Sequence, residues 1–287
     1  MQAVLPTVRL RKLVAALRKH REATGLSITK AARQLGWSTA KLSRIESGTN
    51  RPKPTDVEKI MELYGVPSPE RDALLALSRE TDRRGWWTAF DPLFGSSFMA
   101  LEDEAVAITS WEAMLVPGLL QTEEYAAAVI SRAAALGVDQ AEVARRQAEV
   151  ARRVEARMHR TLLLRGSSPR FHALLGEAVI RQQVGGAEAM RRQLAELWSA
   201  ACQPHITIQI VPFSHPGHLG LDGSVTLFTF DDDDPELDVA HVEGQAGPVY
   251  LESAYAVGRA RATLADVASA AMSPDASREM LAGLANA

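Results

Sequence analysis

The chain has 287 residues, 46% of them hydrophobic and 23% charged, which is typical of a globular protein with one large domain or two ordinary ones. No apolar run approaches the roughly 18–20 residues that cross a bilayer, which excludes a membrane-spanning helix. The single cysteine, Cys202, excludes an intrachain disulfide, and residues 1–7 lack a secretory pattern, so we expect a cytoplasmic protein.

The net charge of -3 at pH 7 hides an uneven distribution along the chain. Residues 1–84 contain 17 Lys and Arg against 9 Asp and Glu, whereas residues 85–287 contain 15 against 26. All six lysines lie at or before Lys59. This basic front and acidic rear predict that a polyanion binds only the front.

Five helices are predicted within residues 10–82, because apolar residues recur there at helical spacing between glycine and proline stops. Ser27, Ser38 and Thr55 are the expected N-caps of the second, third and fourth helices. With these caps included, the ranges are 10–24, 27–35, 38–47, 55–65 and 69–82. Residues 51–54, Arg-Pro-Lys-Pro, predict an extended basic linker before the fourth helix.

The composition changes between about residues 80 and 98, where aromatic residues, glycine and proline gather. We therefore expect one domain over residues 1–84 and a second over 85–287. Further helices are predicted over 100–113, 123–135, 139–160, 187–202 and 254–272, the last range holding one or two helices. Strands are predicted over 171–175, 206–211, 225–230 and 239–242. The expected fold class is α+β, an all-α five-helix domain followed by a mixed helical and small-sheet domain.

Residues 26–48 have the pattern of a helix-turn-helix unit. Ala32 is small where two helices would cross closely, and Gly36 provides the positive φ of a tight turn. Leu42 and Ile45 are placed to pin the third helix to the second. The side chains that remain for the groove side of the third helix are Thr39, Ala40, Lys41, Ser43 and Arg44.

Residues 10–67 closely resemble the phage-repressor-like helix-turn-helix family, often called the XRE family, notably in Arg-Ile-Glu-Ser-Gly at 44–48 and Arg-Pro at 51–52. The resemblance implies that the third helix reads the major groove of double-stranded DNA. It implies base contacts by Thr39, Ala40, Lys41 and Arg44, and phosphate contacts by Thr29, Ser43, Arg51 and Lys53. Many members have glutamine at the position of Ile28, and isoleucine does not form the hydrogen bond by which that glutamine helps to grip DNA.

In the same family, the positions of Arg21 and Glu46 form an internal ion pair between the first and third helices. The alternative is a DNA contact by Arg21. We favour the ion pair, because an unpaired glutamate close to phosphates would repel them.

The rear half resembles an actinobacterial domain that follows a helix-turn-helix in WhiJ-like, Scr-type, toxin–antitoxin-like regulators. The resemblance covers residues 85–281 and rests on Tyr125 and on short motifs at 101–105, 116–122, 176–178, 184–186, 193–194, 210–213 and 217–218. It implies a cytoplasmic regulator, often encoded beside a small partner protein. It transfers no catalytic or ligand-binding residue.

Metal binding is the main chemical alternative for the rear half, because several potential ligands lie near one another in sequence. They are Cys202, His205, His215, His218 and Asp222. The spacing is not that of a zinc site, and a proline and glycine turn explains the two histidines at 215 and 218. We therefore expect no metal and no cofactor.

Three weaker patterns also have simpler explanations. Residues 231–236 are acidic but lack the spacing and glycine of a calcium loop, so a solvated turn is expected. Gly185 and Gly186 before a helix suit an anion, but a simple turn is the better interpretation. An aromatic cluster suits a ligand pocket, but such a cluster is more often core or an interdomain seam; its members are Trp86, Trp87, Phe90, Phe94, Phe98 and Trp111.

The sequence thus predicts a DNA-binding transcriptional regulator that is not an enzyme, since no catalytic motif is present. We expect a homodimer formed through residues 85–287, which include the long helix over 139–160 and leave room for a small-molecule effector. The alternative is an antitoxin-like protein that sequesters a small partner and represses its own operon. An enzyme fused to a DNA-binding domain is a remote third possibility.

Overall fold

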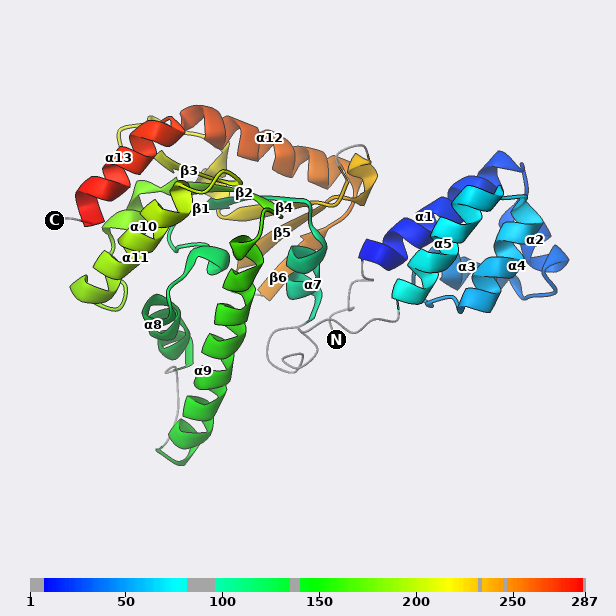
Figure 1. Cartoon of the computed structure of the whole chain (residues 1–287), viewed down its shortest axis with the longest axis horizontal. Helices are drawn as coiled ribbons and strands as arrows, with labels where there is room; N and C mark the ends of the chain where they lie inside the picture. Colours follow the sequence, from blue (N-terminus) through cyan, green and yellow to red (C-terminus); the bar gives the residue numbers. More distant parts are fainter. Residues whose placement is uncertain (1–7, 82–95, 135–139, 232–233, 245–246, 286–287) are drawn as a thin grey trace. The chain divides into compact units, whose positions relative to one another are not determined.

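The computed structural model describes residues 8–81, 96–134, 140–231, 234–244 and 247–285 (Figure 1). Helices α1–α5 belong to one compact unit, and the strands with helices α8–α13 belong to a second. The fold class is α+β, as predicted. Among the described helices, none combines the length and the apolar character needed to cross a membrane.

The first unit contains α1 (Val8–Ala23), α2 (Ile28–Gln34), α3 (Thr39–Glu46), α4 (Pro54–Tyr64) and α5 (Ser68–Glu80). Its buried core draws on all five helices and includes Leu17, Ala32, Leu42, Ile60 and Leu74. The predicted caps hold at Ser27 and Ser38. The predicted cap at Thr55 is wrong, because α4 already begins at Pro54, whose fixed φ suits a first helical position.

The second unit is built on a six-stranded mixed sheet in the order β3-β2-β1-β4-β5-β6. The strands β1, β2 and β3 run parallel, and β4, β5 and β6 are antiparallel to their neighbours. The strand bounds are β1 (Ala107–Glu112), β2 (Arg170–Gly176), β3 (Ile206–Val211), β4 (Val225–Thr229), β5 (Val239–Gly244) and β6 (Gly247–Leu251).

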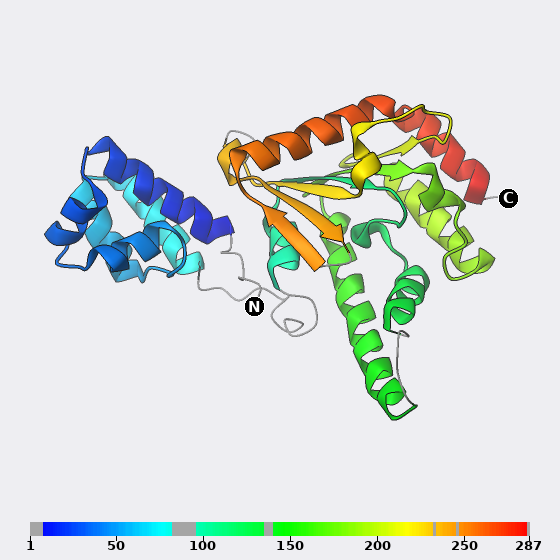
Figure 2. The ribbon, with the colours of Figure 1, turned by 180° about the vertical axis from the view of Figure 1, so that it is seen from behind.

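The helices of the second unit lie around this sheet. Helix α12 packs against the face that carries Trp111, Leu174 and Leu227. Both views show α9 extending away from the sheet with α8 beside it (Figures 1 and 2), and these two helices share a small core around Ile130 and Val154. The helix bounds are α8 (Glu123–Ala134), α9 (Gln140–Thr161), α10 (Glu177–Arg181), α11 (Ala187–Ala201), α12 (Ala254–Ala270) and α13 (Pro274–Ala285). Helix α7 (Ser96–Glu104) is divided between the units, with its residues up to Leu101 in the first and those from Glu102 in the second.

Two sequence predictions for the second unit need correction, and one strand was missed. The helix expected over 100–113 is wrong in its second half, which forms the central strand β1. Helix α13 begins beyond the predicted range of 254–272. Strand β6 was not predicted, because Pro248 and the flanking glycine make a weak strand pattern that only an edge position tolerates.

Candidate nucleic-acid interface and the buried sites of the second unit

The turn between α2 and α3 is short and tightly bonded. Each helix has a serine N-cap. The Oγ of Ser27, before α2, accepts the Lys30 N–H at 3.3 Å, and the Oγ of Ser38, before α3, accepts the Lys41 N–H at 3.2 Å. Between them Gly36 has φ 69°, a conformation that a side chain would disfavour. The backbone N–H groups of Gly36 and Trp37 donate to carbonyls of α2, which fixes the direction in which α3 leaves the turn.

Helix α3 has a buried face and an exposed face. Leu42 and Ile45 lie in the core of the first unit. The predicted base-contacting side chains of Thr39, Ala40 and Arg44 are exposed on the other face, as is Ser43. The sequence pattern alone therefore separates the packing residues from those available to a ligand.

Lys41, the fourth predicted base contact, is engaged within the first unit. Its Nζ lies 2.9 Å from Asp56 Oδ1 of α4 and 3.7 Å from the centre of the Trp37 ring. A contact from Lys41 to DNA would compete with the bond to Asp56, which holds the ammonium group toward α4. The sequence prediction did not include this pair, because the partner lies 15 positions away, beyond the linker.

The cations predicted to meet DNA include two without partners in the described chain. The side chains of Arg44 and Lys53 are exposed and have no hydrogen bond or ion pair with any described residue. Thr29 and Arg51, predicted to contact phosphate, are also exposed. Thr29 lies on α2 and Arg44 on α3, whereas Arg51 and Lys53 lie in the linker before α4. All four are therefore within 15 positions of α3 Arg44 or on that helix itself.

Arg21 and Glu46 form an ion pair that joins α1 to the end of α3. Arg21 Nε donates to both carboxylate oxygens of Glu46, at 2.8 and 3.1 Å, and the Glu46 residue is only 4% exposed. The hydrogen bond to Glu46 raises the pKa of Arg21. Arg21 Nη1 also donates to the Leu26 carbonyl, so the guanidinium has an internal role rather than a free surface position.

Ile28 is partly buried and packs against the core of the first unit. An amide at this position would lose that apolar contact. The Ile28 side chain therefore contributes to the packing of the first unit.

A row of polar side chains crosses four strands on the sheet face opposite Trp111. Ser110 pairs with Thr226, Thr226 with His241, and His241 with Tyr250. Partners in register project to the same face. The Ser110 Oγ is buried and has no hydrogen-bond partner among the described residues. The sequence analysis missed this row, because its members come from segments far apart in the chain.

A buried ion pair joins α7 to α9. Arg160 donates from Nε and Nη2 to the two carboxylate oxygens of Glu102, both at 2.7 Å. Gly118 lies against this pair, since a Cβ there would come within 2.8 Å of Arg160 Nη2. Arg157, one turn earlier on α9, donates to Gln121 Oε1 at 2.7 Å. The sequence contains one signal for this site, which is the pair of arginines three positions apart in an alanine-rich helix.

Several groups near this pair have perturbed pKa values. Burial raises the pKa of Glu112 to about 7, and burial lowers that of Arg157 to about 10. Burial, with a smaller contribution from Arg160, lowers the pKa of His241 to about 4. Burial raises the pKa of Tyr250 to about 12. Such clusters mark either functional sites or structural ion-pair networks, and the satisfied Arg160–Glu102 pair favours a network that fixes α7 and α9.

The residues considered for metal binding are not gathered into one site. Within the described ranges, no three His, Cys, Asp or Glu side chains are grouped as ligands. His205 Nε2 lies 2.9 Å from the Leu164 carbonyl, and His218 Nδ1 accepts the Gly220 N–H. Cys202 is exposed. Of the acidic stretch over 231–236, residues 232 and 233 lie outside the described residues.

The structure also describes the glycine pair before α11 and part of the predicted aromatic cluster. Gly186 has φ 93° and serves as the N-cap of α11, while Gly185 lies against Ala128 and Ala189. Trp111 is a core residue whose Nε1 donates to the Gly220 carbonyl at 2.8 Å. Four aromatic residues of the predicted cluster lie outside the described residues: Trp86, Trp87, Phe90 and Phe94.

Comparison with protein families gives a match for each unit. Residues 96–283 match a domain of unknown function, DUF5753, which covers more than half of the chain. Residues 12–74 match a helix-turn-helix domain, which supports a DNA-binding regulator of the helix-turn-helix type. Comparison with curated proteins and with solved structures gave no match.

Proposed function

The chain belongs to the DUF5753 family, and we propose that this member is a sequence-specific, DNA-binding transcriptional regulator of the XRE type that acts in the cytoplasm. The observation that carries the proposal is the exposed face of α3 beside a tight turn. There Thr39, Ala40 and Arg44 are available for base edges. Thr29, Ser43, Arg51 and Lys53 are assigned to phosphates, and Lys41 joins the base contacts when it leaves Asp56.

In this proposal the second unit makes the protein a homodimer and senses a partner or a small molecule. One helix-turn-helix contacts only a few base pairs, so useful affinity in a genome requires two. Helices α8 and α9 support an assignment of dimerisation to the second unit, because they share only a small core with each other and Leu162, directly after α9, is exposed. The chain catalyses no reaction and needs no metal or cofactor.

An antitoxin-like role, in which the protein sequesters a small partner and represses its own operon, is the second candidate. It is supported by large apolar side chains exposed on the segment between β3 and β4, namely Phe213, Leu219 and Leu221. Such side chains gathered on one segment are typical of a protein-binding surface. A stoichiometric complex with the product of a small adjacent gene, formed through this segment, would favour this candidate.

In vitro selection from random duplex DNA tests the proposed function. At about 0.15 M salt the full-length protein should enrich one motif with two half-sites centred about 34 Å apart, as two-fold symmetry requires. Excess random duplex serves as the competitor, because phosphate contacts alone bind all sequences similarly. Recovery of the input sequence distribution after several rounds would contradict the proposal.

A further inference from the structure

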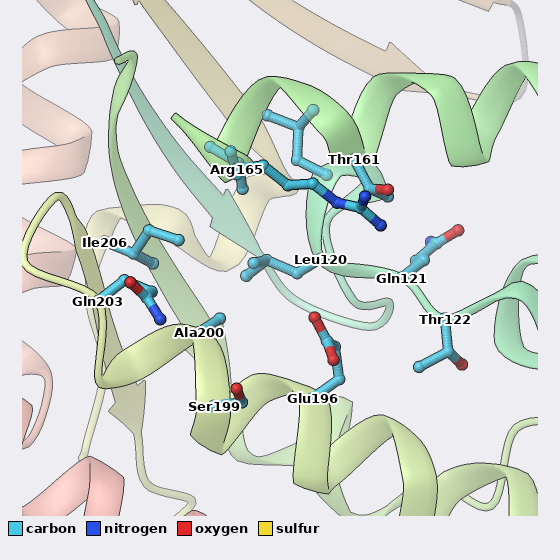
Figure 3. A pocket seen from close by; sticks show the side chains of 12 residues that line it. Leu120, Gln121, Thr122, Thr161, Arg165, Glu196, Ser199, Ala200, Gln203 and Ile206 are labelled. Carbon is cyan, nitrogen blue, oxygen red and sulfur yellow. The ribbon is translucent and has the colours of Figure 1, made fainter. Parts of the chain in front are cut away.

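The second unit contains a pocket of about 440 Å³ between the end of α9, helix α11 and the start of β3 (Figure 3). Its volume falls within the range of small-molecule sites. The lining residues fall into an apolar floor and a polar rim. The floor includes Leu119, Leu120, Leu164, Ala200 and Ile206, and the rim includes Gln121, Thr122, Thr161, Arg165, Glu196, Ser199 and Gln203.

One wall of the pocket is held rigidly by buried side chains. Gln193 is fully buried, donates to the Leu120 carbonyl at 2.7 Å and accepts the Thr122 N–H at 2.8 Å. Gln121 Nε2 donates to the Val116 carbonyl at 2.7 Å. The segment from Val116 to Thr122 is thus fixed before any ligand arrives, which reduces the ordering cost of binding.

The rim carries two opposite charges that are not used elsewhere. Among the residues that the structure describes, neither Arg165 nor Glu196 has an ion pair or hydrogen bond. Figure 3 shows their side chains extending from different elements toward the space in front of Leu120. By contrast, the neighbouring Arg191 and Arg192 of α11 are both paired with Glu188.

We propose that this pocket binds a short apolar peptide with free termini. Its carboxylate would meet Arg165, its ammonium group would meet Glu196, and its apolar side chains would cover Leu120, Leu164 and Ile206. A simple anion would be repelled by Glu196 and a simple cation by Arg165, so the two charges together select a ligand that carries both signs. The proposal concerns the second unit alone and does not depend on DNA binding.

Calorimetric titration of the full-length protein with four related ligands tests the charge requirement. The ligands are leucyl-leucine, its N-acetyl form, its C-terminal amide, and the form blocked at both ends. Leucyl-leucine should bind most tightly, and blocking either end should weaken binding by about fivefold or more, the effect of losing one charge-assisted contact in a partly solvated site. Blocking both ends should weaken it further.

Two variants that each remove one charge identify the residues. Arg165→Gln should bind leucyl-leucine and its amide equally, because the carboxylate no longer has a cation to meet. Glu196→Gln should bind leucyl-leucine and its N-acetyl form equally, for the opposite reason. Arg191→Gln, which removes an exposed charge of α11 outside the pocket lining, should retain the full selectivity.

Three results would overturn the proposal. They are equal binding of the free and doubly blocked dipeptides, unchanged selectivity in both pocket variants, and no detectable heat with leucyl-leucine at millimolar concentration. Both replaced side chains are exposed, so the melting temperature of each variant should match that of the parent. DNA binding is not a readout here, so failure of this proposal leaves the proposed regulatory function standing.

Discussion

Removing the Arg21 side chain should destabilise the first unit strongly. In Arg21→Ala the Glu46 carboxylate, in a residue only 4% exposed, loses a donor that contacts both of its oxygens, and the Leu26 carbonyl loses its Nη1 donor. Stranding one member of a buried pair costs about 3–5 kcal/mol. The Arg21 side chain is 13% exposed, so water reaches part of the pair and we expect the lower end, about 3 kcal/mol.

The coupling between the two residues separates this explanation from simple loss of packing. Glu46→Ala should also be costly, because the Arg21 guanidinium, whose side chain is only 13% exposed, then loses both of its Nε contacts to the carboxylate. The double variant strands neither charge, so its cost should fall short of the sum of the single costs by about 2 kcal/mol.

Hydrogen exchange of the full-length protein, followed in peptides from α1 and α3, measures these free energies without assuming that both units unfold together. A cost of about 3 kcal/mol corresponds to roughly 150-fold faster exchange in each single variant. Exchange in α12 serves as the internal control and should not change. Additive effects in the double variant, or single effects close to zero, would refute the reasoning.

Three further predictions follow from the structure. Asp56→Asn should release Lys41 and strengthen DNA binding at low salt in gel-shift titrations, and an unchanged affinity would mean that Lys41 does not reach DNA. The pKa of Glu112 is raised from 4.5 to about 7, so the stabilisation it provides is present below pH 4.5 and is lost as the pH rises to about 7. Glu112→Gln should therefore match the parent near pH 4.5 and exceed its stability by at most about 2 kcal/mol above pH 7, a discounted figure because the side chain is half-buried; parallel unfolding curves against pH would contradict this. In light scattering, a fragment ending at Glu80 should be monomeric and a fragment over 85–287 dimeric, and the reverse result would move the dimer contact to the first unit.

The helix-turn-helix was predictable from sequence because its signals are local. Serine caps, the positive φ of Gly36 and the apolar spacing of Leu42 and Ile45 all act within a few residues of one another. The same locality explains the failure at Lys41, whose partner Asp56 lies on another helix. Local propensity cannot reveal which exposed-looking charges find a partner after folding.

The second unit was less predictable because its strands are brought together by long-range pairing. Strand β1 carries buried residues on both faces, Ile108 and Ser110 on one and Trp111 on the other, so its sequence does not alternate apolar and polar residues as a half-exposed strand does. The partners Glu102 and Arg160 lie 58 positions apart, and the pocket is lined by segments from Leu119 to Ile206. These features depend on the sheet order, which the sequence pattern did not specify.

The most direct test of the proposed DNA interface compares Arg44→Ala with Lys53→Ala on the selected operator and on a scrambled duplex of equal length. Arg44→Ala should cost about 1–3 kcal/mol on the operator, relax one base position and leave scrambled DNA nearly unaffected. Lys53→Ala should weaken binding to both duplexes by the same factor and reduce the salt dependence by about one phosphate contact. An equal and uniform loss in both variants would contradict the assignment of base contacts to α3.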